Sequence, residues 1–156
     1  MNLYLLSILA HIVGLVMLAG TTLISFIINR RFWRVYPVNS LKAEAIMELG
    51  GRFPAIMGIG MLLLILSGVS LMVQTHGAYG EQLWFRIKFV LILIIIGNSF
   101  IARRLDKKVK AVMAQPTTSA AVHQQLVSLK SNMTLFYAIQ LTLLLAIFTL
   151  GVFKFN

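Results

Sequence analysis

Four long apolar segments constrain what this sequence can fold into. They run roughly from Leu3 to Ile28, from Phe53 to Val73, from Gln82 to Ile101 and from Met133 to Phe153. A helix that crosses the hydrocarbon core of a bilayer needs about 20 mostly apolar residues, and each segment meets that length. Of the 156 residues, 59% are hydrophobic and only 12% are charged, which is typical of a membrane protein. We therefore predict an all-α, integral membrane four-helix bundle that forms a single domain over residues 1–156 and has the lipid bilayer as its surroundings.

The basic residues predict how this bundle is oriented. Eleven of the 14 Lys and Arg residues lie in the first and third connections between spans: Arg30, Arg31, Arg34, Lys42, Arg52, Arg103, Arg104, Lys107, Lys108, Lys110 and Lys130. The positive-inside rule places both connections in the cytoplasm, and so both termini on the outer, periplasmic side of a bacterial inner (cytoplasmic) membrane. The net charge of +10 is then a topology signal, and no nucleic-acid partner is expected. The first span lacks a basic leader and a cleavage site, so we expect it to be a retained helix.

The residue types that are missing exclude several kinds of chemistry. The sequence has no cysteine, which excludes disulfides, thiolate catalysis, iron–sulfur clusters and covalently attached haem. Its four acidic residues lie away from the centres of the spans, so paired-carboxylate catalysis and intramembrane carboxylate relays lack their residues. They are Glu44, Glu48, Glu81 and Asp106.

Three of the spans are expected to continue as helices beyond the membrane. The stretch "LKAEAIMELGGRFP" favours a helix ahead of the second span, with Glu48 and Arg52 spaced for an i, i+4 ion pair. Gly50, Gly51 and Pro54 predict a bend where that helix enters the bilayer. Similarly, "LDKKVKAVMA" extends the third helix and "SAAVHQQLVSLKSN" leads into the fourth.

His11 lies within the first apolar span, where an ionisable side chain needs an explanation. Small and polar residues recur with helical spacing along one face of that span, at Ser7, His11, Gly14, Leu18, Thr22, Ser25 and Asn29. Such a face packs against other helices in membrane proteins, whereas the opposite faces carry Leu, Ile, Val and Phe. We therefore expect the imidazole to point into the bundle.

Lys88 is a second ionisable group inside a span. Counting about 1.5 Å per residue from each span centre places His11 about 7 Å and Lys88 about 6 Å to the same side of the midplane. A buried ammonium group needs an anion or an acceptor, and no carboxylate lies at this depth. Ser67 lies at a similar level and Gln140 lies near the centre of the fourth span. We predict that His11 and Lys88 share an interior cavity, and that an anionic ligand such as a propionate neutralises Lys88.

Two other interpretations of the same residues remain open. Met72 and His76, alone or together with His11, offer the thioether and imidazole ligands of a copper site. Alternatively, His11 and Lys88 only hold helices together in an accessory subunit. A haem between two histidines of one chain is disfavoured, because His76 lies about 11 Å shallower than His11 and His123 lies on the cytoplasmic side. Haem would be held by His11 alone, by His11 with another donor, or across a homo-oligomer.

The segments "LAHIVGLVMLAG", Arg52 followed by "PAIMGIGMLLLILSG", and "LWFRIKFVLIL" together resemble the HemJ-type protoporphyrinogen oxidases. That resemblance, over about residues 7–104, implies a small four-helix bacterial membrane protein of porphyrin biosynthesis. It implies oxidation of protoporphyrinogen to protoporphyrin, with haem b as cofactor. The family's histidine matches His11, its lysine matches Lys88, and its arginine matches Arg52. The stretch "AYGEQLWFRIK" also resembles the CopD copper-resistance membrane domain.

These observations lead to one expected function and two alternatives. The expected function is an oxidoreductase-like protein that binds a haem or porphyrin, with His11 as iron ligand or proton acceptor. Lys88 would pair with a propionate, Arg52 would assist a substrate carboxylate, and Ser67 and Gln140 would add polar contacts. The alternatives are a CopD-type copper-binding or copper-transfer protein and a structural subunit.

Overall fold

The computed structural model describes residues 2–76, 81–114 and 120–153, except for the side chains of residues 120, 121 and 123. The helices are α1 (Leu3–Val35), α2 (Ser40–Leu49), α3 (Phe53–Gln74), α4 (Leu83–Met113) and α5 (Ala120–Phe153), with a 3-10 turn at Gly50–Arg52. α2, the turn and α3 together form one of four helical stretches long and apolar enough to cross a membrane. The predicted all-α fold with four such helices is confirmed.

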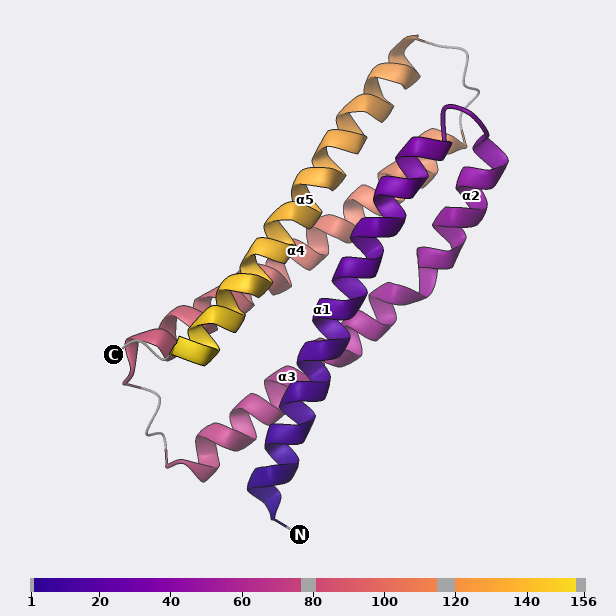
Figure 1. Cartoon of the computed structure of the whole chain (residues 1–156). Coiled ribbons are helices and arrows are strands. Elements are labelled where there is room, and N and C mark those ends of the chain that lie inside the picture. Colours follow the sequence, from indigo (N-terminus) through magenta and orange to yellow (C-terminus); the bar gives the residue numbers. More distant parts are fainter. Residues whose placement is uncertain (1, 77–80, 115–119, 154–156) are drawn as a thin grey trace.

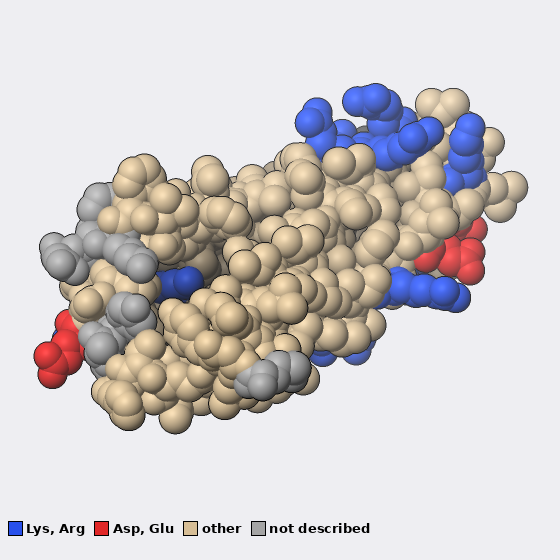
Figure 2. Space-filling model, turned by 60° about the horizontal axis from the view of Figure 1, so that its bottom comes forward, with Lys and Arg blue, Asp and Glu red and all other residues tan. Residues whose placement is uncertain are grey.

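The helices extend beyond the apolar spans, as predicted from the sequence. α1 starts behind Asn2, whose side-chain oxygen accepts a hydrogen bond from the backbone N–H of Tyr4 at 3.2 Å, a side-chain cap on its N-terminus. It then continues past the apolar span to Val35, and α4 continues through the basic stretch to Met113. These extensions carry most of the basic residues, which gather at one end of the molecule in Figure 2.

The predicted bend between α2 and α3 is present. α2 ends at Leu49, the 3-10 turn Gly50–Arg52 follows, and Pro54 occupies the first turn of α3, where a missing N–H costs no helical hydrogen bond. The chain changes direction there in Figure 1. The predicted Glu48–Arg52 ion pair is wrong. The turn interrupts the α-helical spacing between the two residues, and both side chains are exposed without an ion pair between them.

The long helices are arranged as two pairs. α1 packs along α3, α4 packs along α5, and α1 also contacts α5. Figure 1 shows the two pairs close together at the end that holds α2 and diverging toward the end where α1 begins and α5 ends. The two pairs therefore form a bundle that is tighter at its basic end.

Helices α1 and α3 approach each other most closely where their glycines meet. A Cβ atom added to Gly14 would lie 2.8 Å from the carbonyl oxygen of Gly60, and one added to Gly60 would lie 2.9 Å from Cβ of Met17. Contacts this short require glycine, because any larger side chain would push the backbones apart. Ser7 Oγ lies 2.8 Å from Ser70 Oγ, and Gln74 Nε2 donates to both hydroxyls. The small and polar face predicted for the first helix is therefore confirmed as a packed face.

The interior contains two separate apolar clusters. The larger lies at the basic end and includes Phe32, Trp33 and Val109, while the smaller lies in the middle of the bundle. The smaller consists of Leu18, Ile95, Leu144 and Ile147. Large apolar side chains such as Val16 and Leu145 are 65% and 69% exposed, which suits helices whose outer surface meets acyl chains instead of water.

Candidate functional site

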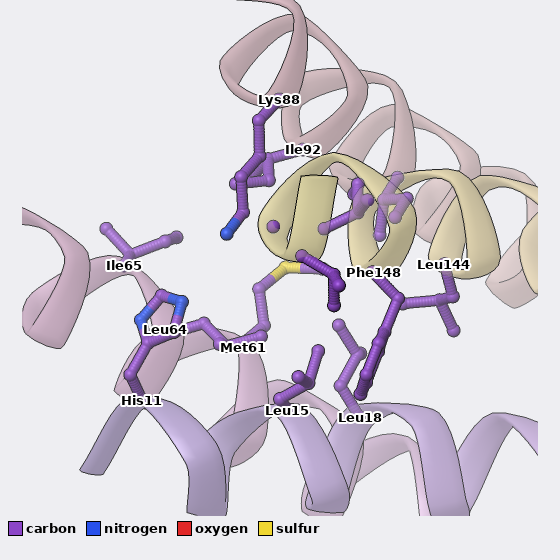
Figure 3. Close-up of a pocket in the computed structure, with 14 residues that line it drawn as sticks. His11, Leu15, Leu18, Met61, Leu64, Ile65, Lys88, Ile92, Leu144 and Phe148 are labelled. Carbon is purple, nitrogen blue, oxygen red and sulfur yellow. The ribbon is translucent and has the colours of Figure 1, made fainter. Parts of the chain in front are cut away.

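A cavity of about 190 Å³ lies between the two helix pairs, and we call it the His11–Lys88 cavity. All four long helices contribute to it, and its only ionisable lining residues in the described chain are His11 and Lys88 (Figure 3). Its other walls are apolar or glycine: Leu15, Leu18, Met61, Leu64, Ile65, Ile92, Ile95, Leu144, Ile147, Phe148, Gly151 and Val152. The predicted convergence of the imidazole and the ammonium group on one interior cavity is confirmed.

The imidazole of His11 is oriented by a serine on the neighbouring helix. Nδ1 of His11 lies 2.9 Å from Oγ of Ser67, and the Ser67 hydroxyl donates its single proton to the carbonyl oxygen of Leu63. The serine oxygen must then accept from His11, so in the neutral imidazole Nδ1 carries the proton and Nε2 keeps its lone pair. Gly68 packs beside the ring, and a Cβ atom there would be in ordinary contact with Cε1 of His11 at 3.8 Å. His11 thus presents one tautomer whose Nε2 can bind a metal or accept a proton.

The ammonium group of Lys88 points across the cavity from α4 toward His11 and Ile65 (Figure 3). The side chain is only partly exposed, and across residues 2–76, 81–114 and 120–153 its nitrogen makes no hydrogen bond or ion pair. No carboxylate of the described chain lines the cavity. Gly151 on α5 lies beside the ammonium group, and a Cβ atom there would be in ordinary contact with Nζ at 3.8 Å. Among the residues that the structure describes, Lys88 thus faces an apolar cavity without a counter-charge.

The other residues predicted to bind a ligand, Ser67, Gln140 and Arg52, do not line the His11–Lys88 cavity. Ser67 is buried behind His11 and orients it from outside the cavity wall. Gln140 is fully buried, and its Oε1 accepts from Nδ2 of Asn98 at 2.8 Å, so it links α4 to α5 without lining the cavity. Arg52 is exposed at the start of α3, about 18 Å along the helix from Leu64. The structure brings His11, Lys88 and Ser67 together and leaves Gln140 and Arg52 apart from them.

The residues predicted for copper do not meet His11. Met72 is 37% exposed, His76 is exposed, and neither lines the cavity. His76 has a φ of 52° just after the end of α3, the left-handed conformation that commonly terminates a helix. Within the described part of the chain, no group of three or more His, Cys, Asp or Glu residues is placed to hold a metal ion. Met61, by contrast, is part of the cavity wall.

Sequence reasoning missed the contributions of α5 to this cavity. Phe148, Gly151 and Val152 form a wall opposite His11, yet none of the α5 residues that line the cavity is polar, so the sequence does not mark them. Gly151 was the one available signal, because a glycine inside a helix weakens it and often has a packing reason. Here it lies beside Nζ of Lys88, where a Cβ atom would still fit at 3.8 Å.

The arrangement combines a fixed neutral imidazole, a cation and dry apolar walls. Such a cavity suits a largely apolar ligand with an anionic group, and it allows proton exchange or metal ligation at Nε2 of His11. Comparisons of the chain with models of protein families, with curated proteins and with solved structures find no match.

Proposed function

We propose that this protein binds a tetrapyrrole, haem b or a porphyrin, in the His11–Lys88 cavity within a bacterial inner membrane and takes part in redox chemistry on it. The observation that carries the proposal is the Lys88 ammonium, which has no counter-charge among the described residues and shares an apolar cavity with an imidazole nitrogen of His11. Ionisable groups inside a membrane are costly, and a ligand carboxylate that pairs with Lys88 offsets that cost.

The imidazole and the ammonium group fit a tetrapyrrole, but the volume of the cavity requires the helix pairs to move before one can enter. A neutral imidazole is an established axial ligand for haem iron, and an ammonium group pairs with a propionate. At about 190 Å³ the cavity is smaller than the 300–1,000 Å³ of typical ligand sites. A tetrapyrrole must therefore enter edge-on, with the two helix pairs moving apart where Figure 1 shows them diverging.

Each residue of the site has a definite task in this proposal. Ser67 holds His11 in the tautomer whose Nε2 faces the ligand, and Nε2 binds the iron or accepts a proton from a porphyrinogen. Lys88 binds a propionate and so fixes the orientation of the ring. The apolar walls exclude water, which strengthens both interactions. When bound, a haem would supply one-electron redox chemistry at the centre of the cavity.

The charge distribution supports the membrane orientation in this proposal. Basic residues gather at the end of the bundle that holds α2, so the positive-inside rule places that end in the cytoplasm (Figure 2). The His11–Lys88 cavity then lies in the outer half of the membrane. The resemblance to the HemJ-type oxidases adds support, because two of the three residues that match that family, His11 and Lys88, are the ionisable residues that line the cavity in the described chain.

The test is a haem titration of the protein purified in mild detergent. We expect a Soret band that saturates at one haem per chain, or per symmetric dimer, and that is lost in His11→Ala. His76→Ala is the matched control, because His76 is exposed beyond the end of α3, and it should keep the parent spectrum. Lys88→Met should retain the band but weaken haem binding. Conversion of protoporphyrinogen to fluorescent protoporphyrin, measured in the same variants, then distinguishes an oxidase from a haem carrier.

The other outcomes are informative as well. Binding that is equal in His11→Ala and the parent protein would place haem elsewhere and overturn the proposal. Stoichiometric copper without a Soret band would favour the copper function. Neither metal nor porphyrin binding would leave a structural subunit as the remaining explanation.

A further inference from the structure

A second cavity, of about 150 Å³, lies at the basic end of the bundle, where the bend between α2 and α3 meets α1, α4 and α5. It shares no lining residue with the His11–Lys88 cavity. Counting along α1, its residue Ser25 lies about 21 Å from His11. The walls mix apolar side chains with a carboxylate, an amide and two hydroxyls. We call it the Asn29–Asp106 cavity.

Asn29 brings an unused hydrogen-bond donor to this cavity. The residue is 6% exposed, and its Oδ1 accepts a hydrogen bond of 2.9 Å from Nε1 of Trp33. That bond fixes the amide so that Nδ2 must be the remaining polar atom, and Nδ2 has no partner among the described residues. A buried amide donor without a partner is destabilising, so an acceptor is expected to fill the place.

Asp106 brings an unused acceptor. Its carboxylate is partly buried and makes no hydrogen bond or ion pair with any described residue. Lys110 and Tyr137 line the same cavity and lie close enough to interact with Asp106 through charge. The cavity therefore presents a donor on α1 and an anionic acceptor on α4, with the Tyr137 ring between the helices.

The charges at this site select a neutral ligand. An anionic ligand would meet the carboxylate of Asp106, and a cationic ligand would meet Lys110 and the surrounding basic end of the bundle. A neutral ring with hydroxyl groups avoids both conflicts. One hydroxyl oxygen accepts from Asn29, another hydroxyl donates to Asp106, and the ring packs against Phe32, Met47 and Tyr137.

We infer that the Asn29–Asp106 cavity binds the dihydroxy ring of a membrane quinol. A volume of about 150 Å³ suits a single substituted ring, and an apolar tail can leave beside Gly51 and Pro54, which are exposed where α3 enters its apolar span. The oxidised quinone binds more weakly, because it has no hydroxyl proton to donate to Asp106. This inference concerns binding alone and does not depend on the proposed tetrapyrrole function.

A larger side chain at position 51 is a way to block the cavity experimentally. It lines the wall, its φ lies outside the left-handed region, and a Cβ atom there would meet nothing within 4 Å. Neither backbone conformation nor packing requires glycine at this position, so Gly51→Leu should fold and place its side chain at the mouth. Gly58→Leu is the matched control, because Gly58 on α3 is equally unobstructed and lines neither cavity.

The experiment is isothermal titration calorimetry of the full chain in nanodiscs, under anaerobic conditions, with ubiquinol-1 and ubiquinone-1 as probes and empty nanodiscs as the blank. We expect saturable binding that is about tenfold tighter for the quinol, the size of one charge-assisted hydrogen bond. Asp106→Asn should remove that preference, and Gly51→Leu should weaken both ligands at least tenfold. Glu44→Gln, which removes an exposed carboxylate at the same end, and Gly58→Leu should bind as the parent does.

Each alternative result has a clear meaning. Heat that matches empty nanodiscs, or equal binding in the parent, Asp106→Asn and Gly51→Leu, overturns the inference and leaves a water-filled cavity. If Gly51→Leu lowers the unfolding temperature, the isosteric Asp106→Asn decides by its quinol-to-quinone ratio. His11→Ala should keep the parent's quinol binding, so failure of the tetrapyrrole proposal and failure of this one remain distinguishable.

Discussion

The contact between α1 and α3 and the junction between the two helix pairs differ in how closely the helices approach. In the α1–α3 contact, Gly14 and Gly60 allow the backbones to touch, and serines form hydrogen bonds across the contact. At the junction, a Cβ atom added to Gly151 would lie 3.8 Å from Nζ of Lys88, an ordinary van der Waals distance, so the packing does not require glycine there. One interface depends on glycine for its close packing, whereas the other encloses the His11–Lys88 cavity.

This difference explains how the protein can hold one polar group firmly and still admit a ligand. His11 belongs to the tight pair and is oriented through Ser67 on α3, whereas Lys88 belongs to the other pair and has no described hydrogen-bond partner. The imidazole is therefore pre-organised, and the ammonium group is free to follow an anion. The following variants test the two halves of that comparison.

The largest effect is expected for Gly14→Val. A side chain at this position meets the carbonyl oxygen of Gly60 at 2.8 Å, and backbone cannot move aside as a flexible side chain can. We expect a loss of about 3 kcal/mol or more in the free energy of unfolding, at the upper end of overpacking costs. Unfolding in detergent by heat or denaturant measures it. Gly20→Val is the control, since a Cβ atom at Gly20 meets nothing within 4 Å, and equal stability of the two variants would contradict the tight contact.

Lys88→Met tests the open junction. The substitution keeps an unbranched side chain that is one atom shorter and removes a charge that has no partner among the described residues, so the ligand-free protein should become more stable by about 2 kcal/mol. Binding of a tetrapyrrole with propionates should weaken at least tenfold. Lys107→Met, at an exposed position of the basic end, should change neither quantity. A Lys88→Met variant that is less stable than the parent would show that the ammonium group has a structural partner.

Ser67→Ala tests how His11 is oriented. Loss of the hydroxyl frees the imidazole to rotate and to change tautomer, which should weaken haem binding about tenfold, as is usual for groups that orient a metal ligand. Ser70→Ala is the control. It removes the hydrogen bonds that Ser70 forms with Ser7 and Gln74, about one helical turn from Ser67, and leaves the contact between Ser67 and His11 in place. A spectroscopic titration of both variants compares them. Equal affinities would mean that packing alone orients the ring.

The smallest effect is expected for Gln140→Leu. The side chain links α4 and α5 through Asn98, and hydrogen bonds of this kind in membrane proteins contribute about 0.6 kcal/mol on average. Its Nε2 has no partner among the described residues, so the leucine also removes a buried unsatisfied donor. Stability should fall by less than 1 kcal/mol, and haem affinity should stay unchanged. Loss of the Soret band in this variant would show that Gln140 takes part in haem binding.

Much of the fold was predictable because hydropathy is a local property. The four apolar helices, the packed face of the first helix and the bend at Gly50 follow from segment length, periodicity and turn chemistry. Part of the site followed as well, since similar depths placed His11 and Lys88 at one level. Depth along a span does not fix the direction around each helix. For that reason Gln140 was expected near the ligand although it points toward Asn98.

The sequence by itself determined that this chain forms long apolar helices with basic ends and two ionisable groups at a common depth. Only the tertiary structure decided which helices pair, where glycines allow the backbones to touch, and that Phe148 and Gly151 of α5 complete the cavity. The reason is physical. Burial in a bilayer depends on composition along one segment, whereas helix pairing depends on the shapes of two surfaces, which become neighbours only after the chain has folded.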